Sequence, residues 1–119
     1  MTIESHSLGF GLQRLALEEP SQIALKDGIG SGEYTYSDLI GLISRFEYFF
    51  QHKNIDHESV VMSCMPNSVE QLVTFLSVAS TGRTFAPVST ESTRLDLESW
   101  INLVRPDLCI IPWGAPSSL

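Results

Sequence analysis

Hydrophobic residues recur at helical spacing in four segments of the chain. The first, Leu8 to Glu19, places Leu8, Leu12, Leu15 and Ala16 on one side and stops at Pro20. A second helix is predicted from a cap at Ser37 or Asp38 to about Lys53, a third from Asn67 to about Thr81, and a fourth from Asp96 to Val104. Each of these three helices has a predicted core-facing stripe. The second helix has Leu39, Ile43, Phe46 and Phe50, and the third has Val69, Leu72, Val73, Leu76 and Ala79. The fourth has Leu97, Trp100, Ile101 and Val104.

Short β-prone runs lie between the predicted helices. Ile23–Lys26 and Tyr34–Tyr36 flank a glycine cluster and predict a small hairpin. Later runs cover Ser59–Met65, Thr84–Val88 and Leu108–Ile111, and the first of these is continuously apolar, as in a strand covered on both faces. The alternation predicts an α/β fold: a βαβαβ parallel-sheet fragment preceded by a short helix and a β-hairpin.

Two sequence signals mark the start and the end of the third predicted helix. Asn67, with Glu70 three residues later, is a helix-start pattern. Gly82 stands in the position that favours a left-handed C-cap.

Length and charge narrow the classes of function. A chain of 119 residues allows one domain, and no linker or repeat divides residues 1–119. Seven Lys and Arg against 14 Asp and Glu give a net charge of −7, which argues against nucleic-acid binding because nothing would displace the counterions. With 43% hydrophobic and 18% charged residues the chain is no disordered tail, and its apolar balance suggests faces meant for other protein.

Targeting signals are sparse. No apolar run approaches the roughly 18 residues of a membrane span, and the N-terminus lacks a secretory signal. Ser117-Ser118-Leu119 is similar to the peroxisomal tripeptide, but Ser118 stands where a basic residue is expected, so a frayed tail is the preferred interpretation. Cys64 and Cys109 lie in apolar stretches and are predicted to be buried free thiols of a cytoplasmic protein.

The glycine cluster invites a nucleotide-binding interpretation that its spacing does not support. Gly28, Gly30 and Gly32 lack a third glycine at the required place, where Glu33 stands, and a strand rather than a helix follows. A carboxylate there would repel a pyrophosphate. A hairpin turn is the preferred interpretation.

The remaining candidates for chemistry have structural explanations. His52 and His57 have no third ligand at metal spacing, and His6 lies near the chain start, so all three are read as solvated. Cys64 lies in an apolar strand and has no base beside it that would generate a reactive thiolate. For the aromatic residues, helix packing is preferred to a binding surface; these residues are Phe46, Tyr48, Phe49 and Phe50. For the acidic pairs Glu18-Glu19 and Asp96/Glu98, a solvated helix face is the preferred interpretation. We therefore assign no catalytic, cofactor-binding or metal-binding residue.

Four blocks of sequence, in order and at matching spacing, resemble one family. Tyr34 to Leu39 (YTYSDL) is similar to an "LTYxEL" opening, and Val60 to Glu70 (VVMSCMPNSVE) to a "VALxxPNSxE" strand-to-helix signature. Phe75 to Val88 (FLSVASTGRTFAPV) resembles "LAxxxAGAxxxPL", and Leu95 to Ile111 parallels "RLxxxLxDSxAxxLI". This is the pattern of the adenylate-forming (AMP-dependent synthetase/ligase) superfamily, which contains acyl-CoA synthetases, luciferases and peptide-synthetase adenylation domains.

The resemblance implies a reaction and also what this segment lacks for it. Full-length relatives use ATP and Mg²⁺ to convert a carboxylate to an acyl-adenylate, then transfer the acyl group to a thiol such as CoA or a carrier-protein phosphopantetheine. Their Ser/Thr/Gly-rich phosphate loop, aromatic-Gly-x-Thr-Glu segment and catalytic lysine lie beyond the end of these 119 residues. The chain is thus expected to be a single partial domain, the front of the large N-terminal domain, binding no cofactor by itself.

The chain departs from the family pattern at two places. Arg83 follows Gly82 and is bulky for a strand entry, and Thr90-Glu91 replaces the usual Asn-Pro or Tyr-Pro. The second departure puts the local structure of that loop in doubt.

Two functions stay open. The first is an N-terminal fragment of an adenylate-forming enzyme, inactive alone, whose partner is the remainder of the adenylation domain. The second is a non-catalytic scaffold or interaction module whose apolar sheet face another protein covers. The acid, the acceptor thiol and the oligomeric state are not specified by these residues.

Overall fold

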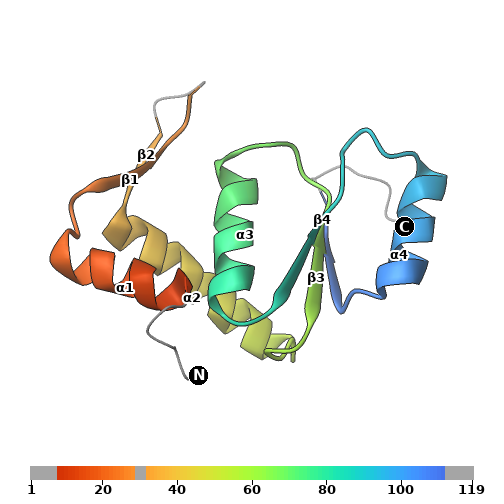
Figure 1. The fold of residues 1–119 in the computed structure, drawn as a ribbon, viewed down its shortest axis with the longest axis horizontal. Helices are drawn as coiled ribbons and strands as arrows, with labels where there is room; N and C mark the ends of the chain where they lie inside the picture. Colours follow the sequence, from red (N-terminus) through yellow and green to blue (C-terminus); the bar gives the residue numbers. More distant parts are fainter. Residues whose placement is uncertain (1–7, 29–31, 112–119) are drawn as a thin grey trace.

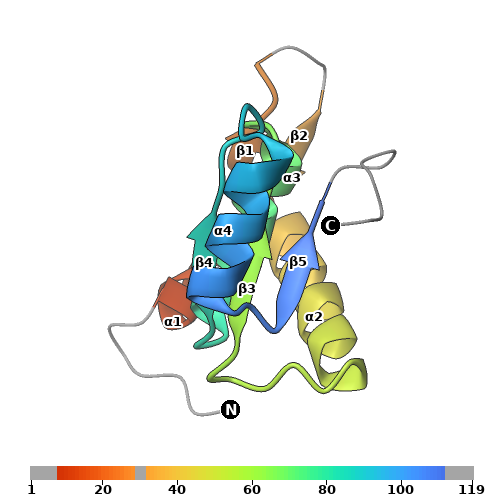
Figure 2. The same ribbon diagram turned by 90° about the vertical axis from the view of Figure 1, so that its right-hand side faces the viewer.

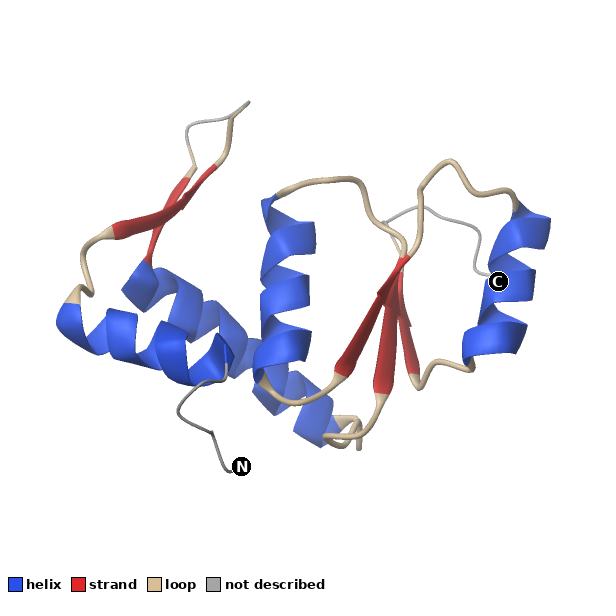
Figure 3. Ribbon diagram, in the orientation of Figure 1, coloured by secondary structure: helices blue, strands red, loops and turns tan. Residues whose placement is uncertain are grey.

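The order of elements follows the predicted alternation. The computed structural model describes residues 8–28 and 32–111. The elements are α1 (Leu8–Glu18), β1 (Ile23–Lys26), β2 (Glu33–Thr35), α2 (Tyr36–His52), β3 (Val60–Ser63), α3 (Val69–Ser80), β4 (Thr84–Pro87), α4 (Arg94–Val104) and β5 (Leu108–Ile110). Figure 1 shows the β1–β2 hairpin beside α1 and α2 at one end, and the β3–β4–β5 sheet between α3 and α4. Figure 3 shows the same layers by secondary structure. The predicted α/β class is confirmed.

The sheet is parallel and has β3 at its centre. The strand order is β4-β3-β5, and Val61 pairs with Phe85 on one side and Leu108 on the other. Val61 and Met62 are buried, so this strand is covered on both faces as its apolar run predicts.

The path of the chain explains why helices cover both faces. From β3 the chain moves to one side of the sheet, and from β4 it crosses back over β3 to reach β5. Crossovers of one hand in opposite directions place their helices on opposite faces. In Figure 2, α4 lies in front of β4 and β3, α2 and α3 lie behind, and β5 is left uncovered on the α4 side.

Side-chain caps shift two helix starts from their predicted positions. Thr35, not Ser37 or Asp38, caps α2: the Asp38 backbone N–H donates to Thr35 Oγ1 at 3.1 Å, and the Thr35 N–H donates to Asp38 Oδ2 at 3.0 Å. Tyr36 is therefore the first residue of the helix and not a strand residue. On α3 the cap is Ser68, one residue after the predicted Asn67.

Two helix ends use the left-handed region. Gly82 has φ +80° just after α3, which confirms the predicted left-handed position. Helix α4 begins at Arg94, earlier than predicted, because Thr93 and Asp96 form a capping box, and Arg105 with φ 52° ends it.

The buried face of α3 is more polar than predicted. Its buried residues are Val73, Thr74, Ser77, Val78 and Ser80. Leu72, predicted to face the core, is exposed. Hydroxyls of this helix can be buried because most bond to a carbonyl of the preceding turn.

Two apolar clusters hold the described chain together. One contains Leu12, Leu39, Ile43 and Val73 and joins α1, α2 and α3. The other contains Phe50, Ile55, Val61 and Val78 and joins α2 and α3 to the sheet. Helix α4 contributes no buried residue. Within the described residues, no helix is both long and apolar enough to cross a membrane.

The two cysteines are free, but only partly as predicted. Cys64 is half-buried and Cys109 is exposed. The prediction of burial is wrong for Cys109 because β5 is an edge strand and α4 does not extend over it.

Candidate functional site

A cleft lies at the carboxyl ends of β3 and β4. The loop after β3 leads to α3 on one face, and the loop after β4 leads to α4 on the other, so the two loops diverge. In parallel α/β sheets such a reversal opens a crevice in which ligands bind. Here it measures about 370 Å³ and is lined by Met65, Pro66, Asn67, Gln71, Pro87, Val88, Ser89, Thr90 and Glu91.

Short hydrogen bonds fix the β3 side of this cleft. Ser63 Oγ donates to Gln71 Oε1 at 2.6 Å, and the Gln71 backbone N–H donates to Ser68 Oγ at 3.1 Å. Ser68 Oγ in turn donates to the Pro66 carbonyl at 3.0 Å. The loop after β3 is thus tied to the first turn of α3.

The β4 side is held to β3 by main-chain and thiol contacts. The Val88 N–H donates to the Ser63 carbonyl at 2.8 Å. The Cys64 thiol donates to the Ser89 carbonyl at 3.7 Å, and the Glu91 N–H donates to Ser89 Oγ at 3.1 Å. Residues 89–91 form one wall, and they include Thr90-Glu91, the pair that departs from the family pattern.

The side chains of the cleft suit a neutral ligand group. Among the described residues that line it, Glu91 is acidic and none is basic. A polyphosphate needs cations or several convergent N–H groups to offset its charge. Amides and hydroxyls from Asn67, Gln71 and Ser89 instead suit a neutral hydrogen-bonding group.

The other sequence candidates do not converge on a site. Gly28 and Gly32 lie at the tip of the β1–β2 hairpin, where the Asp27 N–H donates to the Gly32 carbonyl at 2.9 Å, while Gly30 falls outside the described residues. This supports the hairpin interpretation. His6 and Ser117–Leu119 also fall outside the described residues.

The histidines have separate surroundings. His57 Nδ1 donates to the Thr81 carbonyl at 2.8 Å, and the His52 ring stacks on Tyr48 with centroids 6.1 Å apart. No group of three or more His, Cys, Asp or Glu side chains suited to a metal ion occurs in residues 8–28 and 32–111.

The aromatic residues of α2 divide between packing and exposure. Phe50 is fully buried and Phe46 packs against both apolar clusters, as the packing interpretation predicts. Tyr48 and Phe49 are exposed.

Arg83, which the sequence marks only as a bulky residue at a strand entry, forms a buried ion pair. The Arg83 side chain is 1% exposed and its Nη1 donates to Glu47 Oε2 at 2.7 Å. Its Nε and Nη2 both donate to the Ile55 carbonyl, at 3.1 and 2.7 Å. The guanidinium also lies 4.6 Å from the centroid of the Phe50 ring.

This arrangement joins distant parts of the chain. Arg83 at the α3–β4 corner is tied to α2 through Glu47 and to the α2–β3 loop through Ile55. Glu47 is 36 residues away, so no local pattern could have revealed the partner. The role is structural, because Arg83 does not line the cleft.

Two pKa values are shifted by these surroundings. Burial alone would raise the pKa of Glu47, but Arg83, the Gln51 hydrogen bond and nearby His57 together outweigh it and lower that pKa from 4.5. Partial burial of its sulfur raises the pKa of the Cys109 thiol, although the residue as a whole is exposed. The Glu47 carboxylate is thus held ionised by its partners.

The protein-family model of the AMP-binding enzymes matches residues 12–118 of this chain. The chain belongs to this family. No curated protein matches the chain by sequence.

Solved structures share the fold of this chain. Apo MatB from Rhodopseudomonas palustris superposes with a TM-score of 0.81 at 20% identity, covering 91% of this chain and 21% of that one. IdnL1 superposes with a TM-score of 0.79 at 22% sequence identity, and the match covers 95% of this chain and 24% of IdnL1. The luciferase-like enzyme from the mealworm Zophobas morio superposes with a TM-score of 0.78 at 20% sequence identity, and the match covers 93% of this chain and 26% of that enzyme.

These matches show a shared fold over only part of each neighbour. The chain spans 21–28% of the length of the neighbouring structures. It therefore corresponds to a fragment of a larger adenylate-forming domain, covering the N-terminal portion.

Proposed function

We propose that the chain acts as the N-terminal portion of an adenylate-forming enzyme and is inactive without the rest of that domain. In the proposed reaction, a carboxylate oxygen attacks the α-phosphorus of ATP and releases pyrophosphate. A thiol sulfur, from CoA or a carrier-protein phosphopantetheine, then attacks the acyl carbon and releases AMP. The observation that carries the proposal is that almost the whole chain matches the family while spanning about a quarter of each neighbour.

The residues described here do not fit ATP or Mg²⁺ by themselves. The cleft at the β3 and β4 ends has no basic lining residue among those described, and no acidic cluster suited to a metal occurs in the same part of the chain. Such a reaction depends on positioned charges at the phosphates. We therefore assign to this segment a scaffold role, with no step of the reaction on its own side chains.

The β5 side of the sheet is the proposed contact surface for the remaining domain. Both β4 and β5 are edge strands, but β4 contains Pro87, which cannot donate to a further strand. Residues 108–111 are uncharged and free of proline, and Cys109 is exposed there. Next to this edge, α4 carries Leu95 and Leu103, each 74% exposed. An apolar edge with an uncovered helix suits a partner that continues the sheet.

ATP–pyrophosphate exchange tests the catalytic part of the proposal. The purified 119-residue chain, assayed with a panel of carboxylic acids, is expected to give no exchange above the protein-free blank. Co-expression with the polypeptide encoded directly downstream is expected to restore it. Exchange by the chain alone would contradict the proposed inactivity, and a complex that forms without exchange would favour the interaction-module alternative.

Two matched edge substitutions test the contact surface in the same co-expression. Cys109→Lys on β5 and Thr84→Lys on β4 each place a charge on an exposed edge residue. Only C109K is expected to weaken the complex, because a charged edge opposes strand addition. Equal loss of complex with both variants would overturn the assignment to β5.

A further inference from the structure

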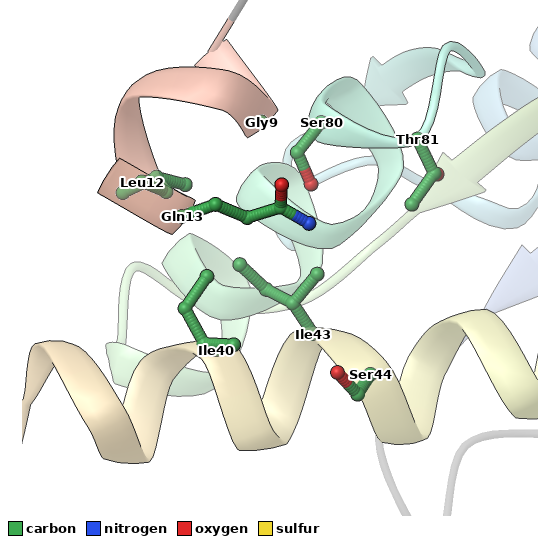
Figure 4. A pocket seen from close by; sticks show the side chains of 8 residues that line it. All are labelled: Gly9, Leu12, Gln13, Ile40, Ile43, Ser44, Ser80 and Thr81. Atoms are coloured by element: carbon green, nitrogen blue, oxygen red, sulfur yellow. The ribbon is translucent and has the colours of Figure 1, made fainter. Parts of the chain in front are cut away.

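A small notch lies where α1, α2 and α3 meet. It has a volume of about 40 Å³ and is lined by Gly9, Leu12, Gln13, Ile40, Ile43, Ser44, Ser80 and Thr81 (Figure 4). Helix α1 comes very close to α3 here, because a Cβ on Gly9 would lie 2.7 Å from the Ser80 carbonyl oxygen. The notch is therefore bounded by three helices, beside the close approach of α1 to α3.

Ser80 differs from the other buried hydroxyl residues of this region. Thr74, Ser77 and Thr81 each donate to the carbonyl four residues earlier, at 2.7 Å in every case. The Ser80 hydroxyl is buried and has no hydrogen-bond partner among the described residues. Figure 4 shows it directed into the notch, with the Gln13 side-chain amide reaching toward it from α1.

A buried hydroxyl without a partner is costly, so native proteins satisfy such groups with protein or water. A site needs roughly 10–15 Å³ of such volume to hold a water molecule, and 40 Å³ exceeds this threshold. An organic ligand would not fit. No described lining residue is charged, so nothing there would hold an ion.

We propose that the notch is an internal hydration site, in which an ordered water molecule bridges the Ser80 hydroxyl and the Gln13 side-chain amide. The bridge joins the end of α3 to α1, next to the apolar cluster that contains Leu12, Ile43 and Val73. The bridge gives α1 a polar attachment to α3 beside this apolar cluster.

Replacing Ser80 with alanine tests the water through the sign of the effect. If the hydroxyl holds a bridging water, S80A loses that hydrogen bond, and the unfolding equilibrium constant in urea rises about fivefold. If the hydroxyl is truly unpaired, its removal leaves that constant unchanged or lower, and the proposal falls.

A double-mutant cycle separates the bridge from a general packing effect. S80A and Q13A are expected to be coupled, because each removes one end of the same bridge. S80A and R14A are expected to be additive, since Arg14 is the next residue of α1 but does not line the notch. Additive effects for both pairs would overturn the bridge.

A direct measurement completes the test on the unmodified chain. Water-to-amide cross-relaxation in the NMR spectrum is expected at the Ser80 and Thr81 amides and is expected to vanish in S80A. No long-lived water signal at either amide would also refute the site.

Discussion

The two faces of the parallel sheet differ in how completely they are built. On the α2 and α3 face, Phe50, Val61 and Val78 are fully buried and a guanidinium is enclosed beside them. On the other face, α4 has caps at both ends but no buried residue. The first face has a fully buried core, whereas the second is covered by a helix none of whose own residues is buried. The difference fits the proposal that further protein packs on the α4 side.

The largest expected effect comes from removing an aromatic ring on each face. Phe50→Ala removes a ring that is 0% exposed and is expected to cost about 4 kcal/mol, through lost burial and the cavity left. Trp100→Ala removes a ring that is 46% exposed and should cost less, about 2 kcal/mol, because only part of its surface is buried. Urea unfolding of both variants measures the contrast. A similar cost for both would mean that α4 is as well packed as α2.

Ion pairs offer a second contrast of the same kind. Arg83→Met leaves Glu47 and the Ile55 carbonyl without their buried partner, with an expected cost of about 3 kcal/mol. Arg94→Met breaks the exposed Arg94–Glu98 pair of α4 and should cost less than about 0.5 kcal/mol. The free energies of unfolding give the comparison. A stable R83M variant would show that the enclosed pair contributes no more than an exposed one.

Alanine substitutions at two glycines of α1 are expected to change the stability of the fold by smaller amounts and in opposite directions. Gly9→Ala forces a Cβ to within 2.7 Å of the Ser80 carbonyl oxygen, which is expected to cost about 1 kcal/mol even after the gain in helix propensity. Gly11→Ala meets no atom within 4 Å and should stabilise the chain by up to about 1 kcal/mol. Thermal unfolding distinguishes the two. Stabilisation by both would mean that α1 does not approach α3 as described.

Acidification gives the smallest expected effect. The folded pKa of Glu47 is lowered, so its ionised form stabilises the fold above the ordinary value of 4.5. That contribution is lost as the pH falls from 4.5 through the lowered folded pKa. Urea titrations across this range should show a weaker pH dependence in Glu47→Gln than in the unmodified chain. An identical dependence in both would contradict a role for this carboxylate.

Most of the fold could be predicted from the sequence because its signals are local. Apolar runs identified the strands, helical periodicity identified the helices, and Gly82 marked the turn at +80°. The errors arose where side chains bond the backbone. Thr35 rather than Ser37 caps α2, and the hydroxyls of α3 let Ser77 lie inside while Leu72 lies outside.

The candidate site was harder to predict for a physical reason. The cleft is created by two loops that diverge from neighbouring strands, and periodicity does not reveal which strands are neighbours. The Arg83–Glu47 pair spans 36 residues, and the partner of a buried charge cannot be identified without the fold. Sequence signals therefore gave the elements but not the contacts between them.

The exposure of Cys109 gives the chain a built-in chemical reporter. Its thiol lies on the open β5 edge, whereas the Cys64 thiol is half-buried and hydrogen-bonded to the Ser89 carbonyl. Because partial burial of the sulfur raises the pKa of this exposed cysteine, alkylation by a thiol reagent should be slow at neutral pH and faster in mild alkali. Whatever covers β5 would shield that sulfur, so the rate of labelling reads out whether this side of the sheet is occupied.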